Sequence, residues 1–266
     1  MQFRQHLTIS EPIRSIAIIF LVLAVPVYWY LHFSEGVLPD LVMHPVHDLQ
    51  LKKTTKEKIL LLFSTTYHNQ GPGKLELHFK PTNQQDADTE RIAMQRIFLN
   101  NGWYRDVEVG TYLWHAEHHH YHFDDFVEYT LEAVNQASGT KLISTSTKSS
   151  FCMRDVSKVS PRPLGSPEEV VYKWCTSLSE GVSVGWGDTY FADYPGQSID
   201  VTGLPSGTYR LTATVNPKSR LQESNYKNNV SSVLFSIDTQ TLVVKVINEY
   251  PKDIPSIEYV RPDNPF

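Results

Sequence analysis

The sequence predicts a mainly β protein, an Ig-like β-sandwich or a barrel, that lies outside the cytoplasm and is preceded by one N-terminal transmembrane helix. Two observations predict this architecture. Between residues 38 and 237, short runs of branched and aromatic residues recur between Gly, Pro and Asn turn signals, and helix signals are few. Residues 15–33 form one uncharged apolar stretch that is long enough to cross a bilayer.

The apolar stretch predicts a signal-anchor helix. At about 1.5 Å per residue, its 19 positions nearly match a hydrocarbon core about 30 Å thick. Arg4 and Arg14 precede it, and no Lys or Arg follows before Lys52, which places the N-terminus in the cytoplasm and the rest of the chain outside. The alternative is a signal peptide that is cleaved to give a secreted protein, although residues 31–36 lack the small-x-small cleavage pattern. Both alternatives export the domain to the periplasm or the extracellular space.

The expected organisation of the chain has four parts. These are a cytoplasmic N-terminus at residues 1–14, the membrane helix at 15–33, the β-domain at 38–237 and a C-terminal tail at 238–266.

Composition limits the partners of this domain. Hydrophobic residues make up 41% and charged residues 20% of the chain, which is a globular balance rather than a disordered one. The net charge of −5 and the absence of a basic run argue against nucleic-acid binding. Cys152 and Cys175 are the two cysteines, and in an exported protein an even pair predicts a disulfide that closes a loop of about 22 residues and adds about 3 kcal/mol of stability. Two free buried thiols are the alternative.

Strand-like segments follow one another along the domain and into the tail. They cover residues 58–68, 74–79, 92–99 (a strand or one helical turn), 111–131, 142–151, 182–192, 198–201, 208–215, 230–237 and 242–247. Two hairpins are expected among them, one through the turn at 69–73 and one through the turn at 203–207. A Gly-rich phosphate loop, a G-x-S-x-G elbow and an H-E-x-x-H helix are absent from the sequence.

Five of the 11 histidines fall within residues 115–122. Alternate side chains of a strand share a face, so His118, His120 and His122 are expected to point one way and His119 the other. Three imidazoles on one face suit Cu(II), Zn(II) or Fe(II), and export favours copper or zinc. The alternative is a solvated, His-rich surface strand. A cupin site is disfavoured because Glu128 follows the histidines too late.

Four ordered motifs resemble the catalytic domain of the lysyl oxidase family. They are W-H-x-x-H-x-H-Y-H at residues 114–122, K-x-S-F-C at 148–152, D-T-Y-x-A-D at 188–193, and the segment from Pro205 to Val230 that contains E-S-N-Y-K-N-N-V. The similarity extends over about residues 38–237, and four motifs in order are far more specific than any one of them.

The resemblance implies a lysyl oxidase-type β-sandwich and a redox centre. His118, His120 and His122 match the copper ligands of the family, and Lys148 and Tyr190 match the two residues that it joins into lysine tyrosylquinone. The implied activity is oxidative deamination of a primary amine, peptidyl lysine or a small amine, by O₂. Its products are an aldehyde, ammonia and H₂O₂.

A catalytic base is expected beside Tyr190, because the reaction must remove a proton from the carbon next to the amine. Asp188 is the first candidate and Asp193 the second, and either could also be a solvated turn carboxylate. His115 is expected either to support the metal ligands or to lie on the surface.

The chain departs from the animal members of the family at three positions. Glu117 and Trp186 stand where those members carry cysteines, and Glu128 stands where they carry a histidine. The resemblance therefore implies that Cys152 and Cys175 form a single rewired bridge. Two other functions remain open at this point: a non-catalytic, extracytoplasmic copper-binding β-domain, and an adhesion domain with incidental histidines.

Overall fold

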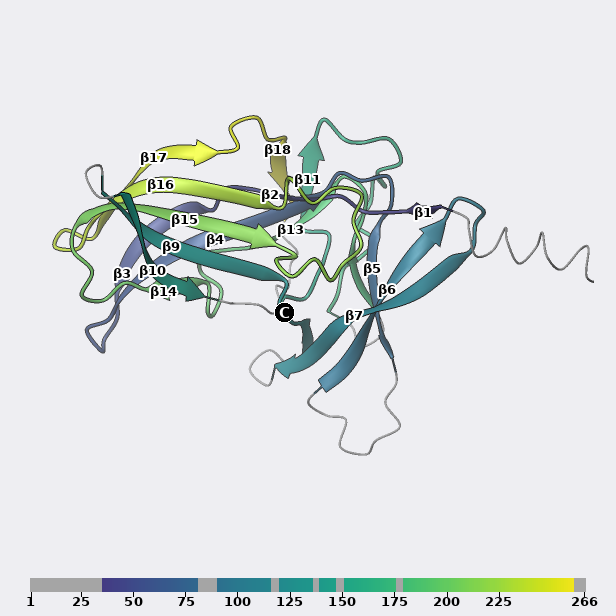
Figure 1. Ribbon diagram of the computed structural model, residues 1–266, viewed down its shortest axis with the longest axis horizontal. Coiled ribbons are helices and arrows are strands. Elements are labelled where there is room, and N and C mark those ends of the chain that lie inside the picture. Colours follow the sequence, from purple (N-terminus) through teal and green to yellow (C-terminus); the bar gives the residue numbers. More distant parts are fainter. Residues whose placement is uncertain are drawn as a thin grey trace, which may run out of the picture.

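Every regular element that the computed structural model describes is a β-strand (Figure 1), so the prediction of a mainly β fold is confirmed. The structure describes residues 35–80, 90–115, 120–135, 139–146, 151–175 and 179–260. The predicted membrane helix at residues 15–33 lies outside these ranges. Within them, no helix has the length and apolar character needed to cross a bilayer.

One layer is a five-stranded antiparallel sheet. Its strands, in spatial order, are β10 (Gly139–Ser146), β9 (Val127–Asn135), β15 (Gly207–Val215), β16 (Val230–Asp238) and β17 (Val243–Tyr250). Along β15, buried residues alternate with half-buried ones, as expected for a strand with one face against a core. Tyr209, Leu211 and Ala213 form part of that buried face.

The second layer is a seven-stranded sheet built around the long strand β4. It contains β14 (Ser198–Asp200), β4 (Ile59–Asn69), β13 (Trp186–Tyr190), β11 (Ser157–Ser160) and β18 (Ser256–Tyr259), with β2 (Leu41–Met43) and β3 (His47–Lys53) also paired to β4. The two layers face each other (Figure 1): the Phe63 ring of β4 packs 5.0 Å from the Tyr129 ring of β9, and Thr65 bonds the Tyr129 hydroxyl at 2.7 Å.

A six-stranded sheet projects from one end of these layers (Figure 1). It contains β12 (Ser179–Val182), β5 (Leu75–Lys80), β6 (Glu90–Leu99), β7 (Tyr104–His115) and β8 (His120–Phe123), with β1 (Gly36–Val37) paired to β6. We call this sheet the arm. It carries the histidine-rich segment.

The first expected hairpin is wrong, because β5 pairs with β6 and β12 rather than with β4. The turn between β4 and β5 crosses the backbone of residues 37–40 at very close range. A Cβ added to Gly73 would lie 1.9 Å from the Val37 carbonyl oxygen. The Asn69 side-chain nitrogen also donates to the Gly73 carbonyl at 2.8 Å. These contacts direct the chain out of the β4 sheet and into the arm.

The second expected hairpin is also wrong. β14 pairs with β4, whereas β15 pairs with β16 and β9, so residues 201–206 cross from one layer to the other. Gly203, at a φ of 78°, provides the left-handed backbone that this crossing uses. In the predicted tail, β17 adds to the edge of the five-stranded sheet and β18 pairs with β11.

Replacement of Gly73 by alanine should destabilise the fold by about 3 kcal/mol, because the new Cβ would overlap backbone atoms that cannot rotate away. Chemical denaturation measures this loss. Gly207→Ala is the control: its Cβ would meet only the Tyr209 ring, at 3.8 Å, so its unfolding free energy should stay within about 0.5 kcal/mol of wild type. Equal stability of the two variants would contradict the close crossing.

Candidate functional site

The histidine-rich segment forms a hairpin rather than one continuous strand. β7 ends at His115 and β8 begins at His120, which are paired across the ladder. His118 lies in the intervening residues, outside the described ranges, and the side chain of His120 is outside the description too. The chain reverses direction between β7 and β8. The alternation of side chains along a single strand therefore cannot be used to place His115 relative to the later histidines. Pairing makes it a direct neighbour of His120, which the sequence did not indicate.

His122 is the predicted ligand whose surroundings the structure describes. It pairs with Leu113 of β7 and is 1% exposed. The adjacent Tyr121 is held on one side by the Trp114 ring, with centroids 5.0 Å apart, and on the other by the Arg91 guanidinium, 4.3 Å from its ring centroid. These contacts fix the backbone on which His122 is carried. Among the described residues, no group of three or more His, Cys, Asp or Glu side chains could hold a metal ion.

Phe151 joins the histidine strand to Tyr190. Its backbone forms two hydrogen bonds with Phe123, the residue after His122: Phe123 donates to the Phe151 carbonyl at 2.9 Å, and Phe151 donates back at 3.2 Å. The Phe151 ring packs at a centroid distance of 4.2 Å against the Tyr190 ring. Lys148 is three residues before Phe151 and lies outside the described ranges. The segments that carry the histidines, the lysine and the tyrosine therefore converge on Phe151.

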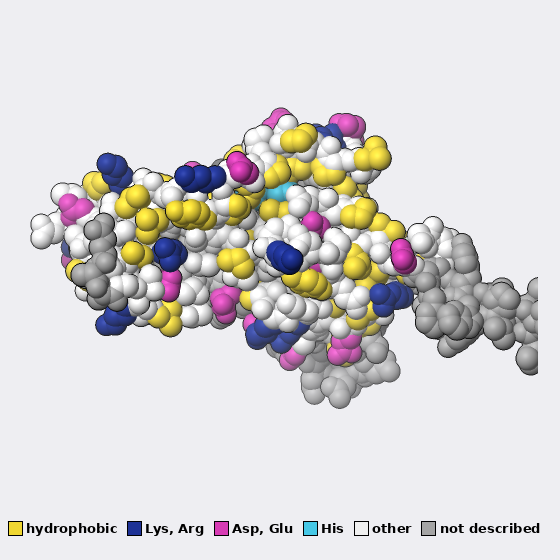
Figure 2. All heavy atoms as spheres, turned by 45° about the horizontal axis from the view of Figure 1, so that its top comes forward, with side chains coloured by type: hydrophobic (Ala, Val, Ile, Leu, Met, Phe, Trp, Pro, Cys, Tyr) yellow, Lys and Arg dark blue, Asp and Glu magenta, His cyan; other side chains and the backbone are white. Residues whose placement is uncertain are grey.

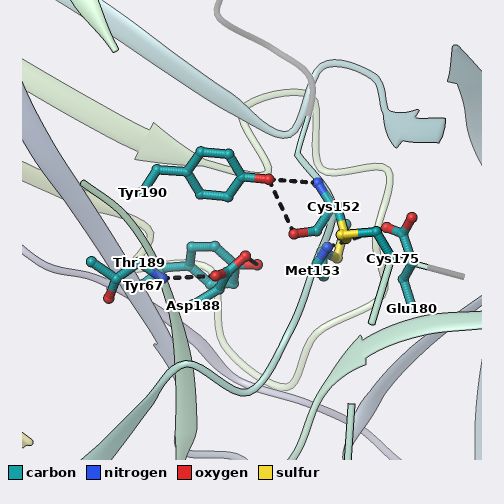
Figure 3. The surroundings of a disulfide bond; sticks show 8 residues. All are labelled: Tyr67, Cys152, Met153, Cys175, Glu180, Asp188, Thr189 and Tyr190. Carbon is teal, nitrogen blue, oxygen red and sulfur yellow. Dashed lines mark hydrogen bonds between the residues drawn. A yellow bond between two sulfur atoms is a disulfide. The ribbon is translucent and has the colours of Figure 1, made fainter. Parts of the chain in front are cut away.

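Tyr190 is the last residue of β13 and is 8% exposed. Its hydroxyl accepts a hydrogen bond from the Cys152 amide at 2.8 Å and donates to the Cys152 carbonyl at 3.2 Å (Figure 3). Burial raises the pKa of this hydroxyl well above its usual value, and the nearby Asp188 raises it further. The ring is thus held in one orientation by the backbone of a residue that is itself covalently anchored.

That anchor is a disulfide between Cys152 and Cys175, with Cα atoms 5.7 Å apart. Asp155 holds the same loop from inside: its carboxylate accepts hydrogen bonds from the amides of Val171, Tyr172 and Ser183 at 2.8–3.1 Å. The Ser183 hydroxyl donates to the same carboxylate at 2.9 Å. These four hydrogen bonds give Asp155 a structural role.

Asp188 lies on the same strand as Tyr190, two residues earlier, and is 1% exposed. One carboxylate oxygen accepts from the Thr189 amide at 2.8 Å, and the other lies 3.5 Å from the Tyr67 hydroxyl (Figure 3). Burial raises the pKa of Asp188 to about 7, against the lowering effect of the Arg154 charge. A carboxyl group with this pKa can accept and release a proton near neutral pH. Asp193, the second candidate base, is exposed beyond the end of β13.

Two charged residues at this site were not found from the sequence. Arg154 is 6% exposed and Glu180 is 1% exposed, and both act electrostatically on Asp188. The Met153 amide donates to Glu180 at 3.2 Å, and burial raises the pKa of Glu180 well above its usual value. Arg154 lies two residues after the predicted F-C motif, but nothing in the local pattern indicates that a charged side chain there is buried.

Trp186 is one of the predicted departures from the animal proteins. It is fully buried, and its indole nitrogen donates to the Pro167 carbonyl at 2.8 Å. A packed ring and a hydrogen bond thus connect β13 to the 161–175 loop. Glu128, another departure, is half-buried on β9 opposite Thr214.

Comparison with known proteins gives consistent matches. The family model for lysyl oxidase matches residues 103–247. Lysyl oxidase homolog 1 from Homo sapiens is 40% identical over 121 residues, which are 45% of this chain and 19% of that protein. Protein-lysine 6-oxidase from Sus scrofa is 38% identical over 118 residues, or 44% of this chain and 43% of the relative. Lysyl oxidase homolog 2 from Gallus gallus is 28% identical over 190 residues, or 71% of this chain and 20% of the relative. The chain thus covers less than half the length of each.

The raised pKa of Asp188 predicts a pH-dependent stability. The native carboxyl keeps its proton at pH values where the unfolded one, with a pKa near 3.8, has lost it, so folding stability falls as pH rises from about 4 to about 7. Asp188→Asn removes this loss and should gain up to about 4 kcal/mol over wild type at pH 8, but little at pH 4. Urea denaturation of the metal-free protein across this range tests it. A stability profile for Asp188→Asn that runs parallel to that of wild type would refute the assignment.

Proposed function

Because the chain belongs to the lysyl oxidase family, we propose that it is a copper-dependent amine oxidase. The proposed reaction converts a primary amine, O₂ and water into an aldehyde, ammonia and H₂O₂. Peptidyl lysine and small amines both present the required group. The observation that supports the proposal best is the convergence of three segments on Phe151, which bonds Phe123 and packs on Tyr190.

Copper suits the donor set of this chain. His118, His120 and His122 would hold the ion through neutral imidazoles, and the burial of His122 suits a ligand that must be kept from bulk water. Lys148 would supply the amine that links to the Tyr190 ring. Lys148 is three residues before Phe151 along the chain, and three residues of chain span at most about 11 Å. When formed, lysine tyrosylquinone supplies an electrophilic carbonyl that accepts two electrons from the amine.

Other residues would accept the substrate proton and hold the Tyr190 ring in place during the reaction. Asp188 would take the proton from the carbon next to the amine, since its pKa of about 7 lets it bind and release a proton at neutral pH. The Cys152 backbone would keep the Tyr190 ring fixed while the amine approaches. The Phe151 ring would shield one side of Tyr190 from water.

We also infer that this domain works outside the cytoplasm, held there by residues 15–33. The disulfide between Cys152 and Cys175 supports an oxidising compartment. A secreted form produced by cleavage would occupy the same compartment.

Variants at the cofactor residues test the activity. The copper-loaded wild-type chain should absorb visible light and release H₂O₂ with primary amines. It should also weigh one oxygen atom more and four hydrogen atoms less than the unmodified, disulfide-bonded chain. Lys148→Ala and Tyr190→Phe should lose all three properties. Tyr194→Phe, which alters a buried ring 6.0 Å from Tyr190, is the control and should keep them. An unmodified mass in fully copper-loaded, folded protein would refute the proposal and leave a non-catalytic copper-binding domain.

Variants at the histidines test the metal site separately. His118→Ala, His120→Ala or His122→Ala should weaken copper binding by more than about 100-fold, since even the outer partners of metal ligands contribute about 10–100-fold. His119→Ala is the matched control from the same motif and should bind copper like wild type. Metal content after dialysis against a chelator, with a thermal melt to confirm folding, provides the measurement. Equal copper retention in all four variants would rule out this ligand set.

A further inference from the structure

The turn between β6 and β7 exposes two aromatic side chains at the far end of the arm. Trp103 is 61% exposed and Tyr104 is 52% exposed, although large aromatic rings are usually covered in a folded protein. The turn itself is well formed: Leu99 donates to the Trp103 carbonyl at 2.8 Å, and the Asn101 side chain accepts from the Trp103 amide at 3.0 Å. The exposure of Trp103 is therefore a property of an ordered turn.

This turn is tied to the point where the N-terminal part of the chain enters the domain. Asn100 donates to the Glu35 carbonyl at 3.1 Å, and β1 pairs with Leu99 and Phe98 of β6 (Figure 1). The apolar stretch at residues 15–33 ends two residues before Glu35. Two residues of chain span at most about 7 Å, so the outer end of that stretch is always close to the turn.

The charges around the turn cancel. The Arg96 guanidinium forms two hydrogen bonds with Asp106 at 2.8 Å and lies 3.8 Å from the Tyr104 ring centroid. Lys74, above the Phe98 ring, is paired with Glu76, and Arg105 and the exposed Glu35 carry opposite charges. Figure 2 shows the same mixture at this end of the molecule, where hydrophobic side chains lie among single acidic and basic ones. A surface of this kind does not favour anionic partners over neutral ones.

We propose that the β6–β7 turn rests on the lipid surface, with Trp103 and Tyr104 at the level of the headgroups. Amphipathic aromatic rings favour that level, and the nearby chain brings the turn to it. The inference rests on the proposed insertion of residues 15–33 in the membrane, but not on amine oxidation. Trp114 lies 11 residues further along the arm, about 36 Å away at the rise of a strand. The histidine end of β7 is thus held away from the bilayer.

Tryptophan quenching in the full-length protein tests this contact. The protein is placed in zwitterionic phosphatidylcholine vesicles that carry bromine atoms at shallow or deep positions of the acyl chains. Trp29→Phe serves as the background, because Trp29 lies within the apolar stretch. Emission in this background should be quenched, and more strongly by the shallow bromines. Adding Trp103→Phe should remove the quenching, whereas adding Trp114→Phe should leave it unchanged.

Several outcomes would overturn the proposal. They are an absence of quenching in the Trp29→Phe background, quenching that survives Trp103→Phe, and quenching that appears only with anionic lipid and disappears in high salt. Trp103 is mostly exposed, so the Trp103→Phe variant should fold normally, which its thermal melt verifies. H₂O₂ release by each variant, measured in parallel, separates failure of the membrane contact from failure of the oxidase activity.

Discussion

The two backbone hydrogen bonds between Phe123 and Phe151 are the contact on which the candidate site depends. β8 belongs to the arm and Tyr190 to the seven-stranded sheet, so nothing in the order of the strands alone brings them together. Phe151 contacts both, through its backbone on one side and its ring on the other. The proposed metal site on the arm and the proposed redox-active ring in the sheet would act as one centre only if this junction keeps its geometry.

The interior around Tyr190 combines groups that usually avoid burial. Asp188, Glu180 and Asp155 are each at most 3% exposed, and Arg154 is the cation whose charge acts on both Asp188 and Glu180. Burial raises the pKa of both Asp155 and Asp188, but Asp155 accepts four hydrogen bonds that hold its loop, and Asp188 accepts fewer. Burying such groups costs stability. That cost is characteristic of sites in which proton affinity is adjusted for chemistry.

The sequence predicted the strands better than their partners. β4, β15 and β16 follow the expected segments closely, because alternation directly records which side chains face a core. Alternation does not record which strand lies alongside, so β5 and β14 were assigned to hairpins that do not exist. The proposed cofactor residues were identified from motifs. Arg154 and Glu180 could not be, since charged residues are ordinarily exposed and only tertiary packing buries them.

The two hydrogen bonds between the Tyr190 hydroxyl and the Cys152 backbone also imply an order of events during maturation. Cys152, whose backbone holds the tyrosine hydroxyl, is itself held by the disulfide to Cys175. Thiol oxidation in the exporting compartment would then come first, and any maturation of the ring second. A chain retained in a reducing compartment would fold into much of the same structure but lack the activity. If the proposed function holds, export would be the step that permits activity.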